Sequence, residues 1–168
     1  KTIYGISDLM FRFWYRYVFS NRTLIETGAS DVVMKRRIEP TYSDYMGLVF
    51  EKVCRDYLTR KNPCGELPIL FTAIGRWWGT DPSKHEQVEI DLIANDSDEY
   101  MFCECKWRNE KLDLPVLKSL MYKADVFRKN RGRTWFVLFS KSGFTDAVIK
   151  EAAKNNDILL VDQGKITE

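Results

Sequence analysis

The sequence predicts an α/β fold in which a mixed central sheet is flanked by helices and preceded by an aromatic N-terminal helix. Three observations predict it. A helical apolar period covers residues 42–61, a pair of acid-bearing strands follows within residues 87–107, and strands at 133–140 and 158–161 alternate with helices. Three successive strands followed by helical crossovers indicate a sheet with both antiparallel and parallel neighbours.

Composition sets the broad class. The chain has 168 residues, 45% hydrophobic and 30% charged, which is enough for one domain with a sizeable core. The net charge of +2 does not by itself indicate nucleic acid. Local basic clusters point there more directly, although solvated loop ends are the commoner explanation for any one of them. They are Lys35-Arg36-Arg37, Arg76 beside two tryptophans, and Arg128, Lys129, Arg131 and Arg133.

No apolar run approaches the roughly 20 residues of a membrane span, and no secretory signal is visible, so we expect no membrane partner. The chain begins at Lys1, which suggests a piece of a longer protein. The four cysteines, Cys54, Cys64, Cys103 and Cys105, lack zinc-ligand spacing and are predicted to be reduced and mostly buried in a cytoplasmic protein. A single histidine, His85, disfavours His-rich metal sites and hydrolase triads.

The N-terminal helix is predicted over residues 7–19, with Ser7 as its cap. Aromatic residues lie on nearly every side of it, interrupted by Arg12 and Arg16: Phe11, Phe13, Trp14, Tyr15, Tyr17 and Phe19. Such a helix is either buried or docked on a partner. Residues 21–31 are predicted as a loop with a short helical or irregular stretch.

The next helix is predicted from a cap at Thr41 or Ser43 to about Lys61, just before a proline. Glu51 lies off its apolar stripe, on a flank of small and apolar residues. Periodicity alone favours an ordinary exposed glutamate, and a side chain that points into a cleft is the alternative. The elements that follow are a strand at 69–78, a loop at 80–86, a hairpin, a helix from Asp113 to Phe127, a buried strand at 133–140, a helix from Thr145 to about Asn155, and a strand at 158–161.

The hairpin carries charges where buried runs are expected. Residues 87–94 and 100–107 flank a polar, turn-like segment, and an even-length loop centred on Asp96-Ser97 pairs Ala94 with Glu99, Asp91 with Phe102 and Glu89 with Glu104. Because side chains alternate along a strand, Glu89, Asp91, Glu104 and Lys106 then share one face, and Ile90, Leu92, Met101, Cys103 and Cys105 share the other.

In this register Asp91 and Glu104 are diagonal neighbours roughly 7–8 Å apart, within reach of one bridging cation. A loop of odd length would put the two acids on opposite faces. Burying carboxylates costs several kcal/mol unless something compensates them. A metal ion is one compensation, and an ion-pair network with Lys106 is the other.

This pattern resembles the PD-(D/E)xK nuclease superfamily through Glu51, Asp91 and Glu104-Cys105-Lys106, and the element order resembles its restriction-endonuclease-like αβββαβ core. A narrower resemblance covers nearly the whole chain. Residues 13–18, 21–26, 75–78, 89–94 and 104–107 resemble the C-terminal, nuclease-like region of a family of archaeal and bacterial AAA-type ATPases. The first acid stands in Glu-Ile-Asp, without the proline that names the motif, and no P-loop occurs.

The resemblance implies a Mg²⁺- or Mn²⁺-dependent DNA endonuclease. Asp91 and Glu104 would hold the metal together with the Cys105 main-chain carbonyl, while Glu51 would support a second metal or a water molecule. Lys106 would orient and help deprotonate the attacking water, or stabilise the transition state, and Glu89 would support the site from its rim. Arg76, Trp77 and Trp78 would contact DNA, and a structural role for the two tryptophans is the alternative.

The resemblance also implies a domain organisation. Residues 1–40 would be a helical segment that packs on the core or on a missing ATPase part, and residues 41–168 would be the nuclease-like domain. Two alternatives stay open. One is a catalytically silent nuclease-fold module that binds DNA or a protein and regulates the ATPase, and the other is a purely structural ion-pair network.

Overall fold

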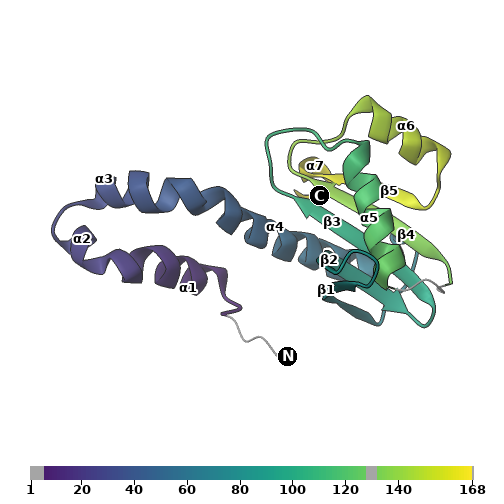
Figure 1. Cartoon of the computed structure of the whole chain (residues 1–168), viewed down its shortest axis with the longest axis horizontal. Coiled ribbons are helices and arrows are strands. Elements are labelled where there is room, and N and C mark those ends of the chain that lie inside the picture. Colours follow the sequence, from purple (N-terminus) through teal and green to yellow (C-terminus); the bar gives the residue numbers. More distant parts are fainter. Residues whose placement is uncertain (1–5, 128–131, 168) are drawn as a thin grey trace. The chain divides into compact units, whose positions relative to one another are not determined.

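The computed structural model describes residues 6–127 and 132–167, and the chain divides into two compact units, Lys1–Val49 and Phe50–Glu168 (Figure 1). Arg128, Lys129 and Arg131 of the predicted basic clusters lie outside the described residues. None of the described helices is long and apolar enough to cross a membrane. The division into residues 1–40 and 41–168 stays a prediction.

The first unit is helical almost throughout. Helix α1 (Leu9–Phe13) begins after Asp8, whose carboxylate accepts a hydrogen bond from the Phe11 N–H at 2.8 Å, so the predicted cap at Ser7 is wrong by one residue. The chain stays helical through η1 (Trp14–Val18), η2 (Phe19–Asn21) and α2 (Arg22–Glu26). Most of the segment predicted as a loop is therefore helix.

The second arm of this unit consists of α3 (Ser30–Val33), η3 (Met34–Ile38) and the first residues of α4 (Glu39–Lys61). The predicted caps at Thr41 and Ser43 are wrong, because the helix is already formed when the chain reaches them. Pro40 lacks an N–H to donate to the preceding turn, and the wider π-helical turn of η3 lies immediately before it.

Tyrosine side chains join the two arms, which lie side by side in Figure 1. The Tyr45 hydroxyl donates to the Leu9 carbonyl at 2.7 Å, and the Tyr17 hydroxyl donates to the Thr41 carbonyl at 3.1 Å. The rings of Phe13, Tyr17 and Tyr45 pack with centroids 5.0–5.7 Å apart. Tyr17 and Tyr45 are buried, whereas other aromatic residues of the first arm stay exposed.

The second unit contains a five-stranded mixed sheet in the order β1-β2-β3-β4-β5, with bounds Ala73–Asp81, Glu86–Asp96, Glu99–Lys106, Thr134–Ser140 and Ile158–Asp162. The pairs β1–β2 and β2–β3 are antiparallel, and the pairs β3–β4 and β4–β5 are parallel. Helices α5 (Leu114–Phe127) and α6 (Asp146–Lys154) make the two crossovers. The predicted α/β fold, a mixed sheet flanked by helices after an aromatic helical region, is confirmed.

Two predicted element limits need correction. Strand β1 begins at Ala73 rather than at Ile69, because the Asn62 side chain bonds both the N–H and the carbonyl of Phe71, at 3.0 and 2.9 Å. Those main-chain groups are thus satisfied without a strand neighbour, while Ile69 and Phe71 fill the core. Two short elements, η4 (Asn62–Cys64) and α7 (Gln163–Thr167), had no counterpart in the prediction.

The sheet is covered on both faces, so the core has two layers. One layer contains Phe50, Cys54 and Leu58 of α4 with side chains such as Met101 and Phe139. The other contains residues of α5 and α6 packed on Phe102, Leu138 and their neighbours. All four cysteines are free thiols and three of them are buried, which confirms the prediction of reduced, mostly buried cysteines, while Cys64 is exposed.

The turn between β1 and β2 is organised by Asp81, which is only 2% exposed. Its carboxylate accepts hydrogen bonds from the Tyr122 hydroxyl of α5 and from the N–H and hydroxyl of Ser83. These hydrogen bonds stabilise the charged carboxylate and lower the pKa of Asp81 to about 2, with the larger effect from Tyr122 and the smaller from Ser83. The ionised carboxylate therefore contributes stability above the ordinary aspartate pKa near 4, and this contribution is lost as the pH falls toward 2.

Tyr122→Phe is therefore expected to lower the Tm by a few degrees at pH 5–8, because the charged carboxylate loses a donor. The difference from wild type should shrink as the pH falls from about 4 toward 2, because protonation of Asp81 removes the charge that the Tyr122 hydroxyl stabilises. Thermal melts from pH 2 to 8 measure this, and Tyr57→Phe is the matched control because Tyr57 contacts Phe139 and Lys61 through its ring. A pH-independent Tyr122→Phe effect would contradict the prediction.

Candidate active site

The β2–β3 hairpin closes through two residues, Ser97 and Asp98, and Ser97 has the left-handed φ of 49°. Asp96 pairs with Glu99, so the turn is centred one residue later than predicted. The predicted pairing of Ala94 with Glu99 is therefore wrong by two residues, whereas the even loop length is correct. Continuing the observed register from the Leu92–Cys103 pair places Asp91 directly across from Glu104 rather than diagonal to it.

A bulge interrupts β2 at the same point. Gly75 pairs with Ile93 and Trp77 pairs with Ile90, so Asp91 and Leu92 together face the single residue Arg76. The bulge changes the alternation of side chains. Ile90 lies with Ile93 in the layer under α5 and α6, and the prediction that it shares the face of Leu92 is wrong.

Asp91 sits where the bulge meets β3. Its Oδ2 atom accepts a hydrogen bond from the Cys105 N–H at 2.8 Å. The carboxylate thus takes the place of the main-chain carbonyl that would accept this bond in a regular pair of strands. Burial and the neighbouring Glu104 carboxylate raise the pKa of Asp91. The Cys105 N–H, Lys106 and Lys123 oppose this rise only in part, so the surroundings of Asp91 disfavour its charged form.

Glu104 is the buried acid of the site, with 4% of the residue exposed. Lys106 Nζ lies 2.5 Å from Oε1, and Lys123 Nζ lies 2.9 Å from Oε2 and 3.2 Å from Oε1. Burial lowers the pKa of Lys106, but Glu104 raises it more, so the net direction is upward. Lys106 therefore stays protonated at neutral pH.

Lys123 was missed by the sequence analysis. It lies on α5, next to the apolar stripe that contains Leu120 and Ala124. The available signal was topological, because a crossover helix that follows β3 packs on the sheet beside that strand. Lys118, Lys123 and Asp125 all lie beside the apolar stripe of α5, so the sequence did not show which of them reaches Glu104.

A second cluster contains Glu51, Arg76 and Glu89. The Arg76 guanidinium pairs with the Glu51 carboxylate and, at 3.1 Å, with Glu89 Oε1. The Glu51 side chain is 21% exposed, so the expectation of an ordinary exposed glutamate is wrong. Burial raises the pKa of Glu51, Arg76 opposes the rise, and the charge of Asp91 adds to it. Glu51 thus lies within electrostatic reach of Asp91 while its carboxylate is engaged by Arg76.

The structure separates the predicted DNA-contacting residues. Trp77 packs edge-on against Phe127 with ring centroids 5.3 Å apart, on the core side of β1. Trp78 alternates to the other side and is 54% exposed. Arg76 is held by two acids, and a phosphate group would have to compete with them. The role of these residues in DNA binding stays a prediction.

The carboxylate oxygens of Asp91 and Glu104 are of the kind that bind a hard divalent cation, but they are not arranged with a third ligand side chain into a complete site. Among the described residues, no three His, Cys, Asp or Glu side chains converge into a metal site. Asp91 and Glu104 nevertheless face each other closely enough for the Glu104 charge to raise the pKa of Asp91. A cation between these oxygens would relieve that repulsion, and Mg²⁺ prefers such ligands.

Comparison with known proteins places the chain in a family. Residues 14–118 match the family DUF234, described as "Archaea bacterial proteins of unknown function". The chain belongs to this family. The matched range includes Glu51, Asp91, Glu104 and Lys106, and the description of DUF234 names no activity.

One curated relative is "Uncharacterized protein MJECL04" of Methanocaldococcus jannaschii, which is 41% identical over 133 residues. The match covers 78% of this chain and 27% of that protein, so the chain spans about a quarter of its relative's length. A crystal structure of "Protein of Unknown Function AF1548" covers 66% of this chain and 57% of that chain, with 19% identity and a TM-score of 0.39. A likeness that low supports no argument about function.

Proposed function

We propose that the chain is a Mg²⁺- or Mn²⁺-dependent DNA endonuclease module of the PD-(D/E)xK type, located in the cytoplasm and attached to a larger ATPase. The observation that carries the proposal is the opposition of Asp91 and Glu104 across the hairpin, with Lys106 bonded to Glu104. The matched region makes up 27% of the curated relative, which leaves room in that protein for an ATPase part. The four free thiols of the chain suit a reducing compartment such as the cytoplasm.

The chain's own residues would divide the work of phosphodiester hydrolysis. Asp91, Glu104 and the Cys105 carbonyl would hold the cation, which when bound neutralises phosphate charge and lowers the pKa of water. Lys106 would act as a hydrogen-bond donor rather than a base, because the pKa of its ammonium group is raised. It would thus orient the attacking water and stabilise the charge that develops on the phosphate oxygens.

Two further residues would support this arrangement. Lys123 would hold Glu104 in place from α5 through its 2.9 Å contact. Glu51, with its raised pKa, would accept a proton or bind a second cation once Arg76 moves away. A phosphate group is the natural competitor for Arg76, because guanidinium groups bind phosphate and carboxylate with similar geometry.

A catalytically silent module is the second candidate, and a specific observation favours it. Both Glu104 oxygens are bonded by lysines and Glu51 is bonded by Arg76, so two of the three proposed acids already have cationic partners. A nuclease-like fold with its acids neutralised in this way could bind DNA or a protein and regulate the attached ATPase.

Lys106→Ala is expected to reduce DNA cleavage by about 100-fold or more, since removal of one preorganised transition-state donor typically costs that much. Plasmid and single-stranded DNA are incubated with the full chain in Mg²⁺, in Mn²⁺ and in EDTA. The matched control is Lys52→Ala, which removes an exposed lysine that pairs with Asp56 on α4. Cleavage that persists in EDTA or in Lys106→Ala would sink the nuclease proposal, and DNA binding without cleavage would support the silent module.

A further inference from the structure

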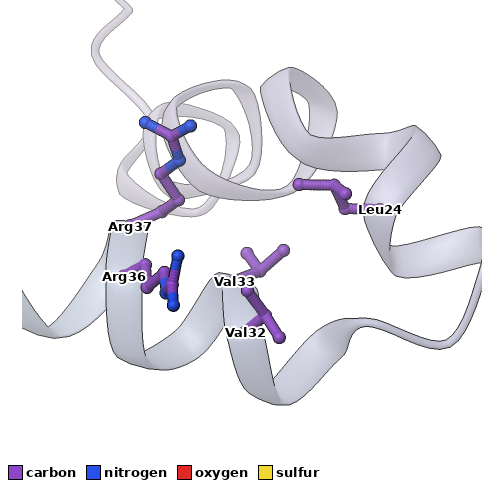
Figure 2. Close-up of a pocket in the computed structure, with 5 residues that line it drawn as sticks. All are labelled: Leu24, Val32, Val33, Arg36 and Arg37. Atoms are coloured by element: carbon purple, nitrogen blue, oxygen red, sulfur yellow. The ribbon is translucent and has the colours of Figure 1, made fainter.

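Two adjacent hollows on the first unit share Arg37. Figure 2 shows the first, where Arg36 and Arg37 of η3 lie beside Val32 and Val33 of α3 and opposite Leu24 of α2. The second is lined by Arg16, Tyr17, Ser20, Asn21, Arg37 and Thr41. Their volumes, about 380 and 430 Å³, fall within the roughly 300–1,000 Å³ of ligand sites. Because Arg37 lines both, the hollows form one continuous basic surface.

The arginines of this surface lack acidic partners. No carboxylate lines either hollow, and among the residues that the structure describes none lies within ion-pair distance of Arg16, Arg36 or Arg37. Arg22 of the same unit, in contrast, pairs with Glu26 at 2.6 Å. Three exposed guanidinium groups without counter-charges favour an anionic ligand, and their spread over two hollows favours a polyanion over a single anion.

The polar side chains that line the second hollow with these arginines already donate their hydrogen bonds to main-chain carbonyls. The Ser20 hydroxyl donates to the Arg16 carbonyl at 2.6 Å, and the Thr41 hydroxyl donates to the Arg37 carbonyl at 3.1 Å. The Asn21 amide donates to the Tyr17 carbonyl at 2.9 Å. Among the described residues, no acceptor engages these guanidinium groups, although that of Arg16 lies 5.3 Å from the centroid of the Tyr17 ring. Their N–H groups suit a ligand rich in acceptor oxygens such as phosphate.

An exposed aromatic stripe lies on the neighbouring side of the same helical arm. Phe11, Tyr15 and Phe19 recur at every fourth residue and are 59%, 49% and 52% exposed. The rings of Tyr15 and Phe19 are 5.5 Å apart, and Trp14 contacts both. Tyr15 and Phe19 directly precede Arg16 and Ser20, which line the second hollow, so the aromatic stripe runs along the helix beside that lining.

We propose that this basic–aromatic face, formed by Trp14, Tyr15, Arg16, Phe19, Arg36 and Arg37, binds single-stranded nucleic acid. The phosphates would contact the three arginines, and the bases would stack on Tyr15 and Phe19. A charged groove beside exposed aromatic rings is the general design of single-strand binding surfaces. The site lies wholly within the first unit and needs no metal, so it is independent of the nuclease proposal.

The first test measures fluorescence anisotropy of a labelled oligo-dT with the full chain in EDTA over a salt series. Arg16→Gln/Arg37→Gln is expected to weaken binding at least about tenfold and to make the salt slope shallower by about 1.4, since each single-strand phosphate contact contributes about 0.7. Arg22→Gln is the control for the loss of one positive charge in the same unit. No binding at low salt, or a double variant that binds like Arg22→Gln, would overturn the proposal.

The second test separates stacking from simple charge attraction. Phe19→Leu keeps an exposed apolar side chain but removes the aromatic face, and it should weaken oligo-dT binding about fivefold, or about 1 kcal/mol per lost stacked base. Binding of a duplex should be weaker than that of oligo-dT and insensitive to Phe19→Leu. Equal binding of both nucleic acids, without any effect of Phe19→Leu, would overturn the single-strand assignment. Circular dichroism of each variant establishes that the helices are retained.

Discussion

Replacing Glu104 with glutamine is expected to lower the Tm by about 4–8 °C and to abolish any metal-dependent cleavage. Removing one partner of a buried ion pair costs about 3–5 kcal/mol, because the remaining charge stays desolvated. Lys106 and Lys123 keep 34% and 21% of their side chains exposed, so water relieves part of this cost. A loss of about 2 kcal/mol remains, and each kcal/mol shifts the Tm by about 2–4 °C in a chain of this size.

Thermal and urea melts of Glu104→Gln measure the effect, with Glu89→Gln as the matched control. Glu89 is half exposed and pairs with Arg76, so its neutralisation should change stability by no more than about 0.5 kcal/mol. A double variant, Glu104→Gln/Lys123→Gln, should regain part of the loss because one of the two unpaired cations is gone. If Glu104→Gln melts at the wild-type temperature, the buried ion pairs on Glu104 do not stabilise the fold.

Asp91→Asn is expected to act in the opposite direction and to raise the Tm by about 2–4 °C in EDTA. Burial and Glu104 raise the pKa of Asp91, so its ionised form is less favourable in the folded than in the unfolded chain. Asparagine removes that charge, and its side-chain oxygen can still accept the Cys105 N–H. A Tm rise of that size corresponds to a gain of about 1 kcal/mol in a chain of this length.

The pH dependence and the cation response of Asp91→Asn follow from the same cause. An acid with a raised pKa binds more protons in the folded state, so wild-type stability falls as the pH rises from about 4 through the raised pKa. The advantage of Asp91→Asn should therefore vanish below about pH 4. Added Mg²⁺ or Mn²⁺ should stabilise wild type, by about 2.7 kcal/mol at a hundredfold excess over Kd, and leave the variant unchanged. A lower Tm for the variant in EDTA, with an intact cation response, would contradict the assignment of Asp91.

The sequence was sufficient to predict which acidic and basic residues of the hairpin lie close together, but not the register in which the two strands pair. Period-two alternation and an even turn were enough to bring Asp91, Glu104 and Lys106 together. The exact register depended on where the turn sits, and a polar run of four residues offers several equivalent turn positions. No residue pattern in β2 predicted the bulge opposite Arg76, because the bulge arises from the pairing of β2 with β1.

Tertiary contacts account for the other differences. Lys123 and Arg76 bind Glu104 and Glu51 from elements that are far away in the chain, and periodicity carries no information about such partners. Likewise, α4 begins early because the arms of the first unit pack through Tyr17 and Tyr45, which stabilises helix beyond the local capping signals. Local rules thus gave the elements, and packing decided their limits.

The short turn of the hairpin has a consequence for the order of folding. A tight hairpin closes on the order of 1–10 μs, so we expect Asp91 and Glu104 to meet early in folding, with only Lys106 near them. We expect Lys123 to reach Glu104 later, when α5 packs on the sheet, because the two residues are 19 positions apart in the chain. Packing of α5 then adds the second lysine beside the two carboxylates and so reduces their repulsion. We therefore expect the two negative charges of the site to be matched by two positive charges only once this helix is in place.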